Sequence, residues 1–204
     1  MRRLGIFFVA AVVFLSLGVA GAAARPKVTV IGDSVADKME RNPVAIAALN
    51  TRFRLDLQTQ GCRRLATTGC TIAGESGPPP NVLRLVKSLA HTIGKIVVVD
   101  VGYNDTPARY DHDLDAVMLE LRHQGVRTVV WLTLRDPQHV YQAANKDIFR
   151  EPREWPEFVI ADWDTYSDGH PDWFAADGIH LTSLGAARLG EFIQSVLRGH
   201  TGHD

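Results

Sequence analysis

Two short segments near opposite ends of the chain carry the residue types of nucleophilic catalysis. Ser34 follows Gly32 and Asp33 in a Gly-Asp-Ser-Val segment, and Asp177 stands three residues before His180. A serine hydroxyl is a weak nucleophile until an imidazole takes its proton, and a carboxylate holds that imidazole in the correct tautomer. These residue types therefore predict acyl transfer through a covalent ester on Ser34, with His180 as the base and Asp177 orienting it.

Hydrogen-bond donors for the negative oxygen of a tetrahedral intermediate are expected from further positions. Asn104 follows a strand-like run, and its side-chain amide can donate to that oxygen while Gly102 leaves room for the substrate. Gly61 can donate through its backbone N–H, as can the residues at the start of the helix that carries Ser34. Each residue also has an ordinary interpretation, because serine is a common helix N-cap and Asn and Gly are common in turns.

The elements that must position these residues alternate between strand-like and helical patterns. Five runs rich in β-branched residues predict strands at 27–31, 53–59, 95–101, 127–134 and 157–161. Helical periods predict helices at 34–50, 81–91, 114–124, 139–149 and 182–198. The third and fourth strand runs are continuously apolar, which is typical of parallel strands covered on both faces. We therefore expect an α/β fold, a three-layer α/β/α sandwich around a parallel five-stranded sheet.

In such a sheet, functional groups gather in the loops at the carboxyl ends of the strands. The order of the four segments in these loops resembles that of the SGNH (GDSL-like) hydrolase family, whose four blocks contribute Ser, Gly, Asn and His on a flavodoxin-like fold. The matching segments are GDSV at 32–35, Gly61, GYND at 102–105 and DGIH at 177–180. The resemblance covers essentially the whole chain after residue 24, although Gly69 and Gly74 compete with Gly61 for the second block.

The resemblance implies a role for each matched residue. Ser34 would be the nucleophile, His180 the base and Asp177 its orienting acid. The oxyanion donors would be the backbone amides of Ser34 and Gly61 together with the side chain of Asn104. No metal and no cofactor is required by this chemistry.

One position departs from the pattern that names the family, because Val35 stands where GDSL has leucine. This variant, on a short exported domain, resembles the SGNH domains attached to envelope acyltransferases. We therefore expect an exported serine esterase acting on short-chain acyl esters, O-acetylated glycans included. The alternatives are an O-acyltransferase of the cell envelope that uses the same site, and a catalytically silent envelope-binding domain. A nucleotide-binding protein ranks last, because both glycine-rich phosphate-binding motifs are missing.

The first 24 residues have the pattern of a secretory leader. Two arginines precede an uncharged run at 4–24, and an Ala-x-Ala site at 22–24 predicts cleavage before Arg25. The alternative is an uncleaved N-terminal anchor, because the 21 uncharged residues can just span a bilayer. In both cases the working domain, residues 25–204, is expected outside the cytoplasm, secreted or in the cell envelope. Cleavage leaves 180 residues with 20 basic and 23 acidic side chains, a formal charge of −3.

The two cysteines of the chain, Cys62 and Cys70, lie eight residues apart. Export places them in an oxidising compartment, and no CxxC pair or third cysteine completes a zinc set, so we expect an intrachain disulfide. Such a bridge closes a short loop next to Gly61, and the loop-entropy model gives it about 2 to 3 kcal/mol of stabilisation. The alternative is a pair of unbridged small hydrophobic side chains.

The composition excludes several classes of protein. Hydrophobic residues make up 46% of the 204 residues and charged residues 22%, which excludes a disordered, collagen-like or coiled-coil chain. The 22 basic residues face 23 acidic ones, which argues against nucleic-acid binding because phosphate recognition needs an excess of clustered basic side chains. We expect one monomeric domain that takes a small acyl ester or an acylated glycan and contacts membranes only through an uncleaved leader.

A stretch rich in aromatic and acidic residues precedes the Asp-x-x-His segment. It holds three of the four tryptophans and four aspartates: Trp155, Trp163, Trp173, Asp162, Asp164, Asp168 and Asp172. These residues could form a sugar-stacking platform beside the site; alternatively, the rings cover the sheet edge and the aspartates form turns. Tyr103 and Arg135 lie nearer the predicted site, and either could line the acyl pocket.

Overall fold

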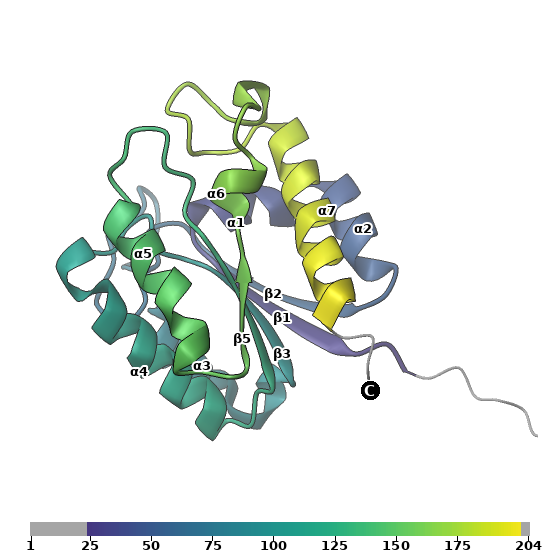
Figure 1. Ribbon diagram of the computed structural model, residues 1–204, viewed down its shortest axis with the longest axis vertical. Coiled ribbons are helices and arrows are strands. Elements are labelled where there is room, and N and C mark those ends of the chain that lie inside the picture. The colour runs from purple at the N-terminus through teal and green to yellow at the C-terminus, as the bar shows by residue number, and fades with distance from the viewer. Residues whose placement is uncertain (1–23, 201–204) are drawn as a thin grey trace, which may run out of the picture.

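The centre of the molecule is a sheet of parallel strands (Figure 1). The computed structural model describes residues 24–200, so the predicted leader, apart from Ala24, lies outside the described residues. The strands are β1(Lys27–Gly32), β2(Arg54–Thr59), β3(Ile96–Asp100), β4(Thr128–Leu132) and β5(Phe158–Ala161). They are arranged in the order β2-β1-β3-β4-β5, and every neighbouring pair is parallel. The predicted five-stranded parallel sheet is confirmed.

Helices cover both faces of this sheet, which makes the predicted three layers (Figure 1). One face carries α1(Ser34–Glu40), α2(Pro43–Asn50) and α7(Ser183–His200); the other carries α3(Val82–Leu89), α4(Tyr110–His123) and α5(Gln142–Arg150). The short α6(Trp163–Tyr166) follows β5. Four 3-10 turns complete the described elements: η1(Ala90–Ile93), η2(Pro107–Arg109), η3(Glu151–Arg153) and η4(Pro171–Trp173). Helix α4 begins earlier than predicted and α5 begins later.

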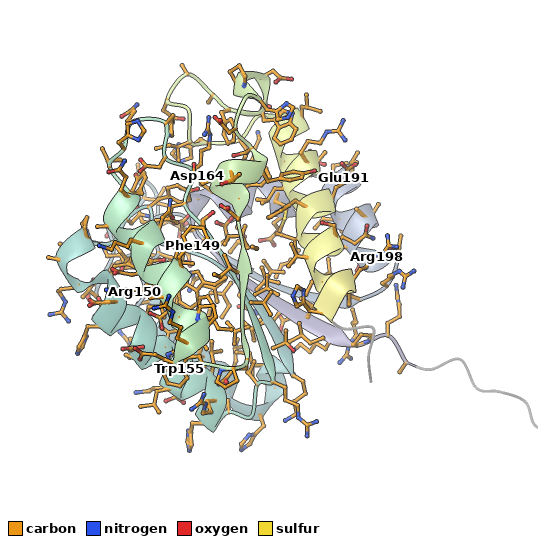
Figure 2. The ribbon with its side chains drawn as sticks, in the orientation of Figure 1. Phe149, Arg150, Trp155, Asp164, Glu191 and Arg198 are labelled. Atoms are coloured by element: carbon orange, nitrogen blue, oxygen red, sulfur yellow. A yellow bond between two sulfur atoms is a disulfide. The ribbon has the colours of Figure 1, made fainter. Side chains whose placement is uncertain are left out.

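Alternate residues of the inner strands enter opposite cores. Val30 of β1 belongs to the core beneath α1, α2 and α7, whereas its neighbour Ile31 belongs to the core beneath α3, α4 and α5. Val98 and Val97 of β3 divide in the same way, and all four side chains are fully buried. Because both faces of these strands are covered, they are apolar throughout. Figure 2 shows side chains filling the space on both sides of the sheet.

The single helix predicted at 34–50 is wrong, because the structure has two helices there. Pro43 has no N–H to donate and its ring clashes with a preceding turn, so the first helix ends before it. Asn42 then caps α2, since its Oδ1 accepts hydrogen bonds from the N–H groups of Val44 (3.0 Å) and Ala45 (3.1 Å). Proline is favourable at the first position of the helix that follows.

The predicted site residues lie in the loops that leave the carboxyl ends of four strands. Helix α1 begins two residues after β1, and β2 leads into a long loop at 60–81. The loop at 101–106 follows β3, and the segment at 162–182, which includes α6, follows β5. Because all the strands are parallel, these loops meet at one edge of the sheet. Between residues 24 and 200, no helix has both the length and the apolar character needed to cross a membrane.

Candidate active site

Ser34 is the first residue of α1, and its hydroxyl is not used to cap that helix. Asp33 is the N-cap: its Oδ1 accepts a hydrogen bond from the N–H of Val35 at 3.1 Å. The interpretation of Ser34 as an ordinary N-cap is therefore wrong. Gly32 lets strand and helix pack closely, because a Cβ placed there would lie 2.1 Å from the Cβ of Ala36. The turn thus leaves the Ser34 hydroxyl available for other contacts.

The structure brings Ser34 together with His180 and Asp177 in one chain of hydrogen bonds. Ser34 Oγ lies 2.9 Å from His180 Nε2, and His180 Nδ1 lies 2.7 Å from Asp177 Oδ2. The other oxygen of Asp177 accepts from the N–H groups of Ile179 and His180, both at 2.9 Å. Partial burial acts to raise the pKa of Asp177, but these N–H groups and the imidazole outweigh it and hold the pKa below its usual value. Asp177 is thus held as the carboxylate.

Gly61 is the glycine that lies beside Ser34. A Cβ placed at Gly61 would be 3.7 Å from the Cβ of Ser34. The same Cβ at Gly69 would instead collide with the carbonyl oxygen of Cys62 at 1.8 Å, and at Gly74 it would meet nothing within 4 Å. Of the three glycines that compete for the second block, Gly61 is the one at which such a Cβ has Ser34 among its nearest neighbours.

The predicted disulfide is present in the structure and follows Gly61 directly. Cys62 and Cys70 are bridged, with their Cα atoms 5.2 Å apart. The bridge closes the start of the loop at 60–81, so it restrains the backbone on the C-terminal side of Gly61. The alternative of two unbridged cysteines is wrong.

Asn104 is tied to the turn that carries Ser34. Its Nδ2 lies 3.4 Å from Asp33 Oδ2 and 3.3 Å from the carbonyl oxygen of Arg63. The N–H of Gly102 also donates to Asp33 Oδ2, at 3.4 Å. These bonds are longer than the usual 2.9 to 3.0 Å, so they orient the amide without satisfying it fully. The loops after β1 and β3 therefore meet at the carboxylate of Asp33, and the loop after β2 joins them through the bond between Arg63 and Asn104.

Three buried ionisable side chains, which the sequence did not single out as site residues, lie beneath these loops. Asp33 is fully buried, and burial raises its pKa to about 6 against the effect of its N–H donors. Arg63 donates to the carbonyl oxygen of Gly32 at 3.1 Å, and burial lowers its pKa to about 10 although the charge of Asp33 opposes that. Burial and the charge of Asp33 raise the pKa of Asp100 well above its usual value, which favours its neutral acid form. One sequence signal was available: aspartate is a preferred N-cap, and Asp33 directly precedes the helix.

Comparison with solved structures decides the fold. TesA superimposes with a TM-score of 0.64 at 19% identity over 85% of this chain and 98% of its own. The esterase EstA from Pseudoalteromonas sp. superimposes with a TM-score of 0.67 at 9% identity, over 87% of this chain and 100% of EstA. A carbohydrate esterase of family 3 from Talaromyces cellulolyticus superimposes with a TM-score of 0.55 at 18% identity, over 85% of this chain and 97% of the esterase. This chain has the SGNH hydrolase fold.

The sequence comparisons agree with this fold over part of the chain. The O-acetyltransferase OatA of Staphylococcus aureus is 29% identical over 109 residues, which are 52% of this chain and 17% of OatA. The chain thus matches a small part of the length of its curated relatives. No protein-family model matches it. The predicted resemblance to the SGNH hydrolases is confirmed at the level of the fold.

Within this SGNH fold, the tryptophans of the aromatic stretch do not form a platform beside the site. Trp163 is fully buried and stacks on Trp173, which is 7% exposed, so both rings pack in the core beneath α7. Trp155 precedes β5 at the amino edge of the sheet and donates to Asp115 at 3.1 Å. Figure 2 shows Trp155 far from Asp164, which lies at the other edge. The alternative, in which the rings cover the sheet, is the correct interpretation.

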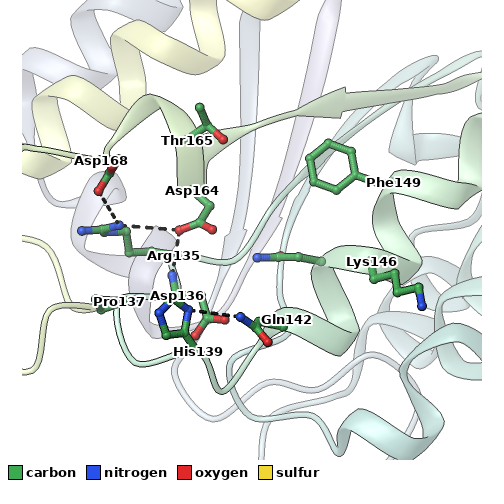
Figure 3. Close-up of a pocket in the computed structure, with 11 residues that line it drawn as sticks. Arg135, Asp136, Pro137, His139, Gln142, Lys146, Phe149, Asp164, Thr165 and Asp168 are labelled. Atoms are coloured by element: carbon green, nitrogen blue, oxygen red, sulfur yellow. Dashed lines mark hydrogen bonds and ion pairs between the residues drawn. The ribbon is translucent and has the colours of Figure 1, made fainter.

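Arg135 lines a hollow between α5 and α6, and Tyr103 contacts Arg135. The hydroxyl of Tyr103 accepts a hydrogen bond from the N–H of Arg135 at 2.8 Å, and its ring contacts the edge of Tyr141. The guanidinium of Arg135 lies 3.6 Å from Asp164 and 3.7 Å from Asp168 (Figure 3). Arg135 therefore lines a polar hollow rather than an apolar acyl pocket. Among residues 24–200, no group of three or more His, Cys, Asp or Glu side chains is arranged to hold a metal ion.

Proposed function

We propose that this chain is an exported serine esterase that cleaves short-chain acyl esters through an acyl-Ser34 intermediate. The observation that carries the proposal is the hydrogen-bonded chain from Ser34 through His180 to Asp177, at 2.9 and 2.7 Å. Gly61 lies beside the serine, and Asn104 bonds the neighbouring Asp33. A serine with a positioned imidazole and an orienting carboxylate is the arrangement that acyl transfer requires. Export is supported by the leader pattern and by the disulfide.

The proposed reaction has two steps. In the first, His180 Nε2 takes the proton of Ser34, Oγ bonds to the acyl carbon, and the carbonyl electron pair moves to its oxygen. That oxyanion accepts hydrogen bonds from the amides of Ser34 and Gly61 and from the side chain of Asn104. When the carbonyl re-forms, the alkoxide leaves with the proton from His180. In the second, a water or an acceptor hydroxyl gives its proton to His180 while its oxygen bonds to the acyl carbon. The bond between that carbon and Ser34 Oγ then breaks, and His180 returns the proton to Oγ.

A second candidate, O-acyl transfer to a glycan hydroxyl, is favoured by the similarity to the S. aureus O-acetyltransferase. It is also compatible with an open site, since the side chains of His180 and Asp177 are 52% and 49% exposed. A second alcohol can reach such an imidazole as readily as water can. The two reactions share the acyl-Ser34 intermediate and differ only in the group that removes the acyl chain.

The replacement Ser34→Ala tests the shared intermediate. We expect it to abolish turnover of 4-nitrophenyl acetate and to remove the acetylated protein species that mass spectrometry detects with the wild type. Ser195→Ala is the matched control, because Ser195 is exposed on α7 and bonds only the carbonyl of Phe192. Normal turnover by a folded Ser34→Ala protein would contradict the proposal. Mass spectrometry of products formed with a glycan acceptor present then separates transfer, which acylates the glycan, from hydrolysis.

A further inference from the structure

A hollow of about 660 Å³ adjoins the proposed active site, between α5 and α6 (Figure 3). Its wall at Pro137 contacts the turn that holds the proposed acid and base: a Cβ placed at Gly178 would lie 3.0 Å from Pro137 Cγ. Gly178 stands between Asp177 and His180 in the chain. The hollow and the turn that holds His180 therefore share Pro137 as a common wall.

The lining of the hollow is charged on both walls. Gln142, Lys146 and Phe149 lie on one face of α5, at the helical spacing i, i+4, i+7. Asp164 and Asp168 lie opposite, on α6 and just after its C-terminal end, with Arg135 beside the two aspartates (Figure 3). Burying an acyl chain against such groups would strip them of water without replacing its hydrogen bonds. The hollow is therefore unsuited to the acyl half of an ester.

The same lining suits a ligand that carries several hydroxyl groups. A hydroxyl both donates and accepts, so it can bond the carboxylates of Asp164 and Asp168. It can also bond the ammonium of Lys146 once that flexible side chain, which Figure 3 shows directed away from the aspartates, turns toward the ligand. The ion pairs of Arg135 with the two aspartates, at 3.6 and 3.7 Å, are longer than a hydrogen bond. They therefore neutralise the carboxylates while leaving them able to accept hydrogen bonds from a ligand.

One further feature of the hollow points the same way. Phe149, which lines the hollow, is 50% exposed, although a large aromatic ring normally packs in a core. Such a ring offers an apolar surface to the C–H face of a sugar.

We propose that this hollow binds the alcohol half of the substrate, and that this alcohol is a sugar. The inference rests on the proposed function, because it assigns the two halves of the ester to different sides of His180. In hydrolysis the hollow would hold the alcohol that leaves, and in transfer it would hold the alcohol that accepts the acyl group. One site therefore serves both reactions. A volume of about 660 Å³ has room for a sugar residue and its neighbour in a chain.

Exchanges on the α5 wall test the proposal by substrate preference. We compare kcat/KM for mono-O-acetylated cellotetraose with kcat/KM for 4-nitrophenyl acetate, which has no sugar. Phe149→Ala and Lys146→Gln should each lower the ratio of the two values by about fivefold or more, the equivalent of one lost contact. Leu119→Ala and Lys87→Gln are the matched controls, because both residues are exposed on other helices, and they should leave the ratio unchanged. An unchanged ratio in both α5 variants would overturn the proposal.

A binding experiment separates failure of this inference from failure of the proposed reaction. Unacetylated cellotetraose is titrated into the Ser34→Ala protein and backbone amide shifts are followed by NMR. Shifts grouped on residues 142–149 and 164–168 are the expected result, and they require no catalysis. Absence of such shifts, with Ser34 still essential for ester cleavage, would overturn the sugar site alone. Shifts at the hollow together with full activity of Ser34→Ala would instead support the sugar site and contradict the proposed reaction.

Discussion

The carboxylate of Asp33 accepts a hydrogen bond from the side-chain amide of Asn104, with Oδ2 and Nδ2 3.4 Å apart. The same carboxylate caps α1 through the N–H of Val35 and accepts from the N–H of Gly102. One buried side chain therefore connects the helix that begins with Ser34 to the proposed oxyanion donor. Asp33 is a positioning residue in this arrangement, since no feature of the structure requires it to touch the substrate.

Removing the carboxylate of Asp33 should disturb the position of the Asn104 amide more than it disturbs the binding of substrate. We expect Asp33→Ala to lower kcat for 4-nitrophenyl acetate by about tenfold or more with a small change in KM, because a misdirected amide stabilises the oxyanion poorly. Asp111→Ala, which alters an exposed carboxylate at the start of α4, is the control. A loss confined to KM, in a protein with wild-type circular dichroism, would contradict the positioning role.

The raised pKa of Asp33 makes a second prediction, about stability. Its pKa is about 6 in the folded protein against an ordinary 3.8, so between these values the folded chain holds a proton that the unfolded chain releases. Stability from this group is therefore greatest at low pH and is lost as the pH rises. The free energy of unfolding of the wild type relative to Asp33→Asn should fall by about 3 kcal/mol between pH 3.5 and 6.5. Urea unfolding at several pH values measures it, and a difference independent of pH would refute the titration.

Asn104 is expected to act in the transition state. Asn104→Ala should lower kcat by roughly a hundredfold or more while KM changes little, since one oxyanion donor is lost. Steady-state kinetics with 4-nitrophenyl acetate separates the two parameters. Asn145→Ala is a poor control, because that amide bonds both the N–H and the carbonyl of Leu134. Asn50→Ala, at the end of α2, is the better one. A change confined to KM would identify Asn104 as a turn residue.

The disulfide should support both stability and the position of Gly61. The double replacement Cys62→Ser with Cys70→Ser should lower the free energy of unfolding by about 2 to 3 kcal/mol, because the unfolded chain regains the freedom of the closed loop. We also expect kcat to fall at a temperature where the variant is still folded, since the backbone after Gly61 loses its restraint. Chemical unfolding and ester turnover are measured on the same preparations. Loss of stability without any loss of kcat would show that Gly61 does not depend on the bridge.

Most of the fold could be predicted from local patterns. The inner strands Ile96–Asp100 and Thr128–Leu132 are continuously apolar because helices cover both of their faces, and that covering leaves its mark on the sequence itself. The helix break at Pro43 also has a local signal, an asparagine followed by a proline, which the periodicity of 34–50 concealed. The boundaries of α4 and α5 differ because helix ends depend on what packs against them.

The contacts of the candidate site are likewise of two kinds, local ones that the sequence predicts and long-range ones that it does not. Asp177 and His180 are three residues apart, so a single turn is enough to join them, and spacing alone predicts their contact. Ser34 and His180 are 146 residues apart, and Asp33 and Asn104 are 71 apart. These contacts depend on the strand order β2-β1-β3-β4-β5, which the residue pattern of no single strand encodes. The sequence by itself therefore determined which residues are candidates for the chemistry, whereas the tertiary structure decided which of them meet, because parallel strands bring their carboxyl ends to one edge regardless of separation along the chain.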